Sequence, residues 1–245
     1  MTSTEAMIYQ LKNLKGKPFK QKVEHIVTYF WLPILVTVGI LFVSISYIVH
    51  LATLKDTALN VICLNTYGDT ALANAYVNDF AIDAGIDLEE YEVFISTDLT
   101  LDDQDLNTAY NTAQVIVAQV AAHSVDMIAG DLATATRYFY QEMFWELDEI
   151  LSPEQQEKYA EYFLYADMAV IRQLQQELVE SPVFPDPTKP EEMAEPVAVA
   201  LRVPMESGFK ENCYTYWKTD IAVGIVATAP NLENVLAFLD YIMME

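Results

Sequence analysis

The chain has 245 residues, and 13 Lys and Arg stand against 36 Asp and Glu, which gives a formal net charge of −23. The charge is unevenly divided, because residues 1–55 carry +4 and residues 56–245 carry −27. A surface this acidic repels phosphate backbones, which excludes nucleic acid as a partner of the larger part. The roughly 190 residues of that part suffice for one domain with a hydrophobic core.

An uncharged apolar run, IVTYFWLPILVTVGILFVSISYIV, covers the 24 residues 26–49. As a helix it would be about 36 Å long, which exceeds the roughly 30 Å hydrocarbon core of a bilayer. It is longer than the apolar region of about 7–15 residues in a cleaved signal peptide, and the following HLATLKD is a poor cleavage site. We therefore expect an uncleaved transmembrane helix that anchors the chain in the lipid bilayer.

The residues that flank this run predict its orientation. Five lysines precede it, and these are Lys12, Lys15, Lys17, Lys20 and Lys22. Because cytoplasmic flanks carry an excess of Lys and Arg, residues 1–25 are predicted to form a basic cytoplasmic segment. Residues 56–245 then form an extracytoplasmic domain, and the expected location is the cell membrane.

Short apolar runs alternate with helical patterns after the membrane segment. The expected strands lie at residues 59–64, 91–96 and 125–129, and the helices between them at 69–83 and 106–122. This alternation is typical of a parallel sheet whose strands are connected by helices.

The second half of the domain has a different order of elements. Helical patterns at 134–144, from 152 and at 167–179 are followed by the proline-rich linker SPVFPDPTKPEEMAEP, then by strands at 197–203 and 221–228 and a helix at 232–243. The predicted fold class is therefore α/β, with an N-terminal transmembrane helix and one mostly parallel five-stranded sheet flanked by helices.

Three segments, VDMIAGD, WELDEIL and IAVGIVATAPNLENVLAFLDYIM, resemble the extracellular solute-binding proteins of bacterial ABC transporters, which have the type 2 periplasmic-binding fold. The resemblance implies an α/β lobe that acts by binding. Members of that family have two lobes around a ligand cleft. Here only about 65 residues separate the third and fourth expected strands, which leaves little room for a second sheet. We therefore expect a single lobe that is fixed to the membrane.

The loops that follow the carboxyl ends of the parallel strands are the expected binding edge. Asn65, Tyr67 and Asp69 follow the first strand, and Asp131 follows the third. They offer an amide donor, an aromatic face and carboxylates beside helix N-termini. The alternative is structural: Gly68 forms a turn, and Asp69 and Asp131 cap the helices that follow them.

A second candidate site is the aromatic segment CYTYWKTD, which contains Tyr214, Tyr216 and Trp217 just before an expected strand. These side chains could form a stacking platform for a ligand or a protein partner. They could equally form a lid over the edge of the sheet.

Motifs for catalysis or metal binding are missing from the sequence. HExxH, GxSxG, P-loop and GxGxxG patterns do not occur. An EF-hand alignment that starts at Asp103 places Thr108 where Gly is required and Gln114 where Glu is required. Capping of the following helix explains these acids better. We expect neither an enzyme nor a bound metal or cofactor.

The two cysteines, Cys63 and Cys213, both lie in the predicted outer domain. A disulfide could persist there, but Cys63 lies within the apolar run LNVICL, which favours a buried free thiol. The sequence alone leaves their pairing open.

The predicted function is therefore binding rather than catalysis. We expect a single-pass, membrane-anchored accessory or sensing ectodomain of a cell-envelope complex, whose partner is an envelope protein or a small cationic or polar ligand. A membrane-tethered receptor that delivers solute to an ABC-type transporter is the alternative, and an unrecognised hydrolase is a more distant one.

Overall fold

The structure is a computed structural model that describes residue 9 and residues 18–66, 69–101, 106–176, 182–214 and 219–244, without the side chains of residues 25, 26, 29, 50–52 and 106. The chain divides into two compact units, Met1–Leu54 and Lys55–Glu245. The first unit contains helix α2 (Phe19–Ala52), and the second contains an α/β domain.

Helix α2 contains the apolar segment Phe30–Val49, which is long and apolar enough to cross a membrane. The same test is passed by a signal sequence near an N-terminus. Along the segment the large apolar side chains are exposed, with Phe30 as an exception. Thr37 Oγ1 donates a hydrogen bond to the carbonyl oxygen of Pro33 at 2.9 Å, so this hydroxyl has a partner within the helix. The predicted apolar span is confirmed by length and composition.

A six-stranded sheet forms the centre of Lys55–Glu245 within the described residues. Its strands are β1 (Asp56–Leu64), β2 (Tyr91–Leu99), β3 (Met127–Asp131), β4 (Phe163–Asp167), β5 (Pro196–Arg202) and β6 (Ile221–Ile225). Their order is β2-β1-β3-β6-β5-β4. Strand β1 pairs in parallel with β2 and β3, whereas the pairs β3–β6, β6–β5 and β5–β4 are antiparallel. The α/β class is confirmed, but the prediction of five mostly parallel strands is wrong.

Strand β6 runs back beside β5, and this antiparallel pairing makes the sheet mixed. Residues 203–220 connect the two strands, and their described part contains the short helix α9 (Gly208–Cys213). The chain therefore turns back at the edge where β5 ends. The strand β4 was missed because five residues, FLYAD, lie between two helical patterns.

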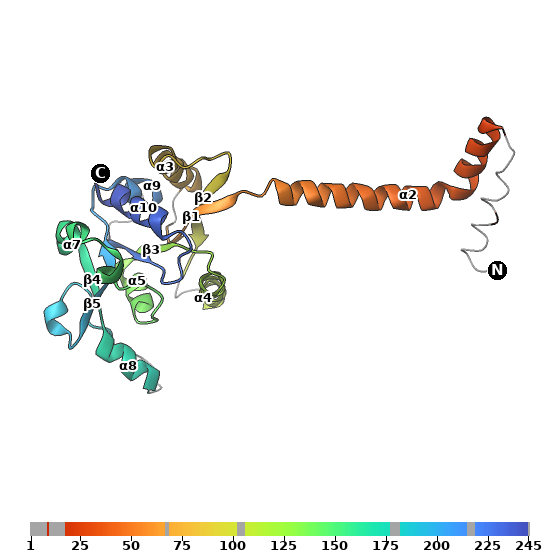
Figure 1. Cartoon of the computed structure of the whole chain (residues 1–245). Helices are drawn as coiled ribbons and strands as arrows, with labels where there is room; N and C mark the ends of the chain where they lie inside the picture. The colour runs from red at the N-terminus through yellow and green to blue at the C-terminus, as the bar shows by residue number, and fades with distance from the viewer. Residues whose placement is uncertain are drawn as a thin grey trace. The chain divides into compact units, whose positions relative to one another are not determined.

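Helices cover both faces of the sheet (Figure 1). One hydrophobic cluster contains residues of α3 (Thr70–Asp83), α6 (Leu147–Ile150), α7 (Pro153–Tyr159), α9 and α10 (Leu232–Met244). The other contains residues of α4 (Leu106–Ala121), α5 (Leu132–Phe139) and α8 (Met168–Gln176). Strand β1 serves both clusters, because Val61 and Cys63 belong to the first and Ile62 and Leu64 to the second. This alternation is the two-residue period of a strand buried on both faces.

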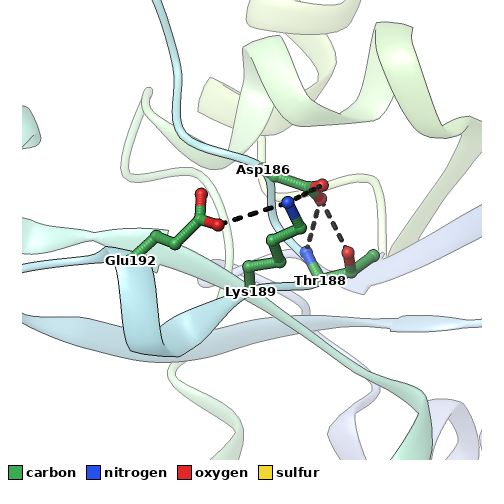
Figure 2. A network of polar contacts seen from close by, with 4 residues as sticks. All are labelled: Asp186, Thr188, Lys189 and Glu192. Carbon is green, nitrogen blue, oxygen red and sulfur yellow. Dashed lines mark hydrogen bonds and ion pairs between the residues drawn. The ribbon is translucent and has the colours of Figure 1, made fainter.

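The proline-rich linker contains a polar turn on the surface (Figure 2). The carboxylate of Asp186 accepts hydrogen bonds from Thr188 N at 3.0 Å and from Thr188 Oγ1 at 2.7 Å. These bonds lower the pKa of Asp186, and Lys189 Nζ lies 3.2 Å from Glu192 Oε1. Exposed ion pairs of this kind contribute little to stability, so the network shapes the turn. Apart from the 3₁₀ turn η2 (Pro190–Glu192) and Pro196, which begins β5, the described part of the linker lacks helices and strands.

The buried carboxylate of Asp167 attaches this linker to the sheet. Its oxygens accept hydrogen bonds from the backbone N–H groups of Ala169 at 3.0 Å, Ala194 at 2.8 Å and Glu195 at 3.1 Å. Burial alone raises the pKa of Asp167, but these donors and Val170 N together lower the pKa below its ordinary value. The carboxylate therefore contributes to folding in its charged form.

Another buried carboxylate, that of Asp126, joins β1 to the start of α10. Asp126 Oδ2 accepts a hydrogen bond from Asn60 N at 2.8 Å, and Oδ1 accepts one from Asn231 N at 2.9 Å. Beside it, Asn234 Nδ2 donates to the carbonyl oxygen of Ala58 at 2.8 Å. The first strand of the domain is thus tied directly to its last helix.

Candidate functional site

Strands β1, β2, β3 and β5 end at one edge of the sheet, and β4 and β6 begin there. This arrangement follows from the strand pairing. Backbone hydrogen bonds connect the strand ends, since Asn65 N donates to Leu99 O at 3.0 Å and Leu132 N donates to Asp220 O at 3.0 Å. The edge predicted for binding therefore collects loops from both the parallel and the antiparallel half of the sheet.

Asn65 connects three of these strand ends. Its φ of 57° lies in the left-handed region, which Asn adopts more readily than most residues. Its Oδ1 accepts from Leu101 N at 2.7 Å, and its Nδ2 donates to Asp131 Oδ2 at 3.0 Å and to Thr134 Oγ1 at 3.1 Å. The side-chain amide is therefore bonded within the protein on both its donor and its acceptor side.

The two predicted aspartates cap helices at this edge. Asp69 accepts a hydrogen bond from Ala71 N at 2.8 Å and begins α3. Asp131 accepts one from Thr134 N at 3.0 Å and begins α5. Both carboxylates satisfy backbone donors that the first turn of a helix leaves unpaired. Capping is thus the role that the observed contacts assign to them.

Tyr214 lies in the hydrophobic core rather than on the surface. Its hydroxyl donates to the carbonyl oxygen of Leu64 at 3.1 Å, and its ring centroid lies 6.0 Å from that of Phe209. Burial raises the pKa of Tyr214, and the nearby Cys63 and Cys213 raise it further. The other three predicted site residues, Tyr67, Tyr216 and Trp217, lie outside the described residues.

A cavity of about 540 Å³ opens at the same edge, on the side of β4, β5 and β6. Its lining consists of Tyr162, Arg202, Val203, Pro204, Met205, Glu206, Asp220 and Met243. Tyr162 precedes β4, Arg202 ends β5, and Asp220 precedes β6, so the strand ends themselves form the walls. The volume lies within the range of about 300–1,000 Å³ that is usual for small-molecule sites.

Three ionisable side chains of the lining have no hydrogen-bonded or ion-paired partner in the described part of the chain, although Asp220 interacts electrostatically with Lys210. Arg202, Glu206 and Asp220 make no side-chain hydrogen bond or ion pair with any described residue. By contrast, Arg172 lies on the surface and pairs with Glu195 at 2.5 Å. A half-buried guanidinium with no carboxylate partner among the described residues is unexpected in a region with seven Lys and Arg against 34 Asp and Glu. The cavity therefore presents positive and negative groups that a ligand could satisfy.

Lys210 stands behind one wall of this cavity. Its side chain is 5 % exposed, and Nζ donates to Thr219 O at 2.8 Å and contacts Met205 Sδ at 2.7 Å. Burial lowers the pKa of Lys210, and the nearby carboxylate of Asp220 offsets part of this effect. Lys210 thus ties together the two loops that supply Met205 and Asp220 to the lining.

The cavity lies at the edge of the sheet that the sequence analysis proposed for binding, but none of its charged lining residues was among the predicted site residues. Tyr162, Arg202, Asp220 and Met243 are far apart in the chain, and only the sheet brings them together. One signal was available, because three of the seven Lys and Arg in residues 56–245 occur within the 17 residues 202–218. In the described residues, no group of three His, Cys, Asp or Glu is placed to hold a metal ion.

Comparisons with known protein families, curated proteins and solved structures found no match to this chain. The resemblance to solute-binding proteins therefore rests on the quoted segments alone and stays a prediction.

Proposed function

We propose that this chain is a single-pass, membrane-anchored extracytoplasmic domain that binds a small zwitterionic ligand and serves as a sensing or accessory ectodomain of a cell-envelope complex. The observation that carries the proposal is the cavity of about 540 Å³ whose charged groups, Arg202, Glu206 and Asp220, make no hydrogen bond or ion pair with a described side chain. The apolar helix α2 supports the anchoring, and the five lysines that precede its apolar segment support an outward-facing domain.

The charges of the lining determine the class of ligand. The planar guanidinium of Arg202 matches a carboxylate, which it can hold through two parallel hydrogen bonds. The carboxylates of Glu206 and Asp220 attract an ammonium group. A ligand with only a carboxylate would be repelled by Glu206 and Asp220, and a ligand with only an ammonium group would be repelled by Arg202. A ligand with both groups therefore fits the lining best.

Binding is tested by thermal unfolding of the full-length protein in detergent, with zwitterionic amino acids compared with simple carboxylates and simple amines. A ligand at 100 times its Kd stabilises by about 2.7 kcal/mol, which raises the Tm by roughly 5–10 °C for a domain of this size. We expect such a shift with at least one zwitterion and with neither single-charge series.

Two substitutions locate the binding. Arg202→Gln and Asp220→Asn should abolish the shift, because each removes a charge that faces the ligand. Arg172→Gln is the matched control, since it removes the same charge from an exposed surface pair. The proposed site is refuted if no zwitterion shifts the Tm of the wild type, or if Arg202→Gln responds as the wild type does.

Orientation is tested separately in intact cells with a membrane-impermeant maleimide. Asp79→Cys places a thiol on the exposed face of α3, and Lys20→Cys places one before the apolar segment. We expect Asp79→Cys to be labelled in intact cells and Lys20→Cys only after permeabilisation. The reverse pattern would contradict the proposed topology.

A further inference from the structure

The two cysteines of the chain lie in the same hydrophobic cluster, and both are free thiols in the structure. Cys63 belongs to β1 and Cys213 ends α9, and both side chains are completely buried in the same cluster. The pKa of Cys63 is raised, by burial first and then by the neighbouring Cys213 thiol. An independent contact fixes the same two segments, because the Tyr214 hydroxyl donates to Leu64 O at 3.1 Å. The residues that follow the two cysteines are therefore bonded to each other as well.

We propose that Cys63 and Cys213 form a disulfide when the domain folds outside the membrane. This inference depends on the proposed extracytoplasmic location, because disulfides persist in oxidising compartments and not in the cytosol. Both thiols are inaccessible in the folded domain, so the bond forms before the core closes around them. In a disulfide the two sulfur atoms lie about 2.05 Å apart, so the two thiols, which are free in the structure, have to approach to this distance.

The chemistry is a two-step thiol–disulfide exchange with the disulfide of an oxidoreductase or of oxidised glutathione. One cysteine thiolate attacks that disulfide, forms a mixed disulfide and releases a carrier thiolate. The second cysteine thiolate then attacks the mixed disulfide, which forms the Cys63–Cys213 bond and releases the second carrier thiolate. The protein loses two electrons and two protons, and the carrier disulfide is reduced by two electrons to its two thiols.

The bond would join the central strand β1 to the helix that supports the cavity. Helix α9 carries Lys210, which holds Met205 and Thr219, and it begins at Ser207, whose hydroxyl donates to Ile242 O at 2.8 Å. The disulfide closes a loop of 150 residues between positions 63 and 213. It would therefore restrict the unfolded chain and fix the cavity wall to the centre of the sheet.

The test is a thiol count on the full-length protein, isolated from membranes with thiols trapped by alkylation and then denatured. We expect no free thiol and an intact mass about 2 Da below that of the reduced chain, since each thiol loses one hydrogen. Reduction should lower the Tm by roughly 10 °C, as expected for a loop of this length. Two alkylated cysteines in protein from the membrane would overturn the proposal.

A refolding experiment separates a wrong geometry from a wrong location. Purified protein is unfolded in urea and refolded in a buffer of reduced and oxidised glutathione, and the disulfide should form within one chain. The variant Cys63→Ala/Cys213→Ala is the control, and its Tm should not respond to reductant. Failure to oxidise in this buffer overturns the geometry. Oxidation in the buffer but not in cells overturns the disulfide as the native state, and maleimide labelling of Asp79→Cys then shows whether the domain faces the cytoplasm.

Discussion

Gly224 is the fourth residue of β6 (Ile221–Ile225), and the ring of Phe144 lies against it. A Cβ added at Gly224 would lie 2.6 Å from Phe144 Cδ1 and 2.7 Å from Cε1. Carbon atoms in contact are normally about 3.5–4.0 Å apart, so the ring would have to move by roughly 1 Å. The neighbouring backbone opposes this movement, because Trp145 N donates to Ile225 O at 2.9 Å and Ala227 N donates to Met143 O at 2.7 Å.

We therefore expect Gly224→Ala to destabilise the domain by about 3 kcal/mol, at the upper end of the cost of overpacking a core. The measurement is urea unfolding of the fragment 55–245, which contains both hydrophobic clusters, and the midpoint should fall by about 1 M. Gly130→Ala is the matched control in β3. Its Cβ would meet Leu64 Cβ at 3.5 Å, an ordinary contact, so it should cost less than about 1 kcal/mol.

A double-mutant cycle tests the assigned cause. Phe144→Ala alone should cost about 3–5 kcal/mol through the cavity that it leaves. In combination with Gly224→Ala the loss should be smaller than the sum by about 2 kcal/mol, because the collision is removed. Strict additivity, or a Gly224→Ala variant as stable as the wild type, would refute the reasoning.

Three buried polar groups give further predictions, each measured by urea unfolding of the same fragment. Asp126→Asn should lower the free energy of unfolding by about 2–3 kcal/mol, because an amide NH₂ group then faces a backbone N–H group whose hydrogen bond the carboxylate oxygen had accepted. An unchanged midpoint of urea unfolding would contradict this. The folded-state pKa of Asp167 is lowered, so its stabilisation is present above the unfolded value of about 3.9 and is lost as the pH falls through the folded value. As the pH is lowered, the free energy of unfolding of Asp167→Asn should therefore fall less than that of the wild type. An equal dependence on pH in the two proteins would contradict this. The folded-state pKa of Lys210 is also lowered, so the unfolded chain binds more protons between that value and about 10.4, and stability rises with pH across this window. Lys210→Met should lack this rise. If the free energies of unfolding of the variant and the wild type change in parallel with pH, burial does not destabilise the charged form of Lys210.

The first three strands were predictable because each is a short apolar run bounded by polar residues. Strand β4 was not, since its sequence FLYAD follows α7 through a single 3₁₀ turn and its burial depends on pairing with β5. The direction of β6 could not be predicted from the sequence either, because hydrophobic periodicity indicates that a strand is buried but not whether it runs parallel or antiparallel to its neighbours. Periodicity is a local property, whereas strand direction depends on the path of the connection.

The candidate site shows the same limit. Helix capping by Asp69 and Asp131 follows from local sequence, and the contacts that cap α3 and α5 are present. The role of Asn65 is not local, because its amide meets Leu101 and Thr134, which are brought to it by the sheet. A cavity between strand ends has lining residues from separate parts of the chain, so one sequence contains no pattern for it.

The position of β1 determines how the domain would resist mechanical tension. Any pull on the N-terminal helix reaches the domain along the backbone at Asp56, the first residue of β1. Because β1 pairs with β2 on one side and with β3 on the other, it leaves the sheet only when its hydrogen bonds to two neighbours break. An edge strand would be held by one neighbour alone. The bonds from Asn60 to Asp126 and from Asn234 to Ala58 add resistance near the residue where the force enters.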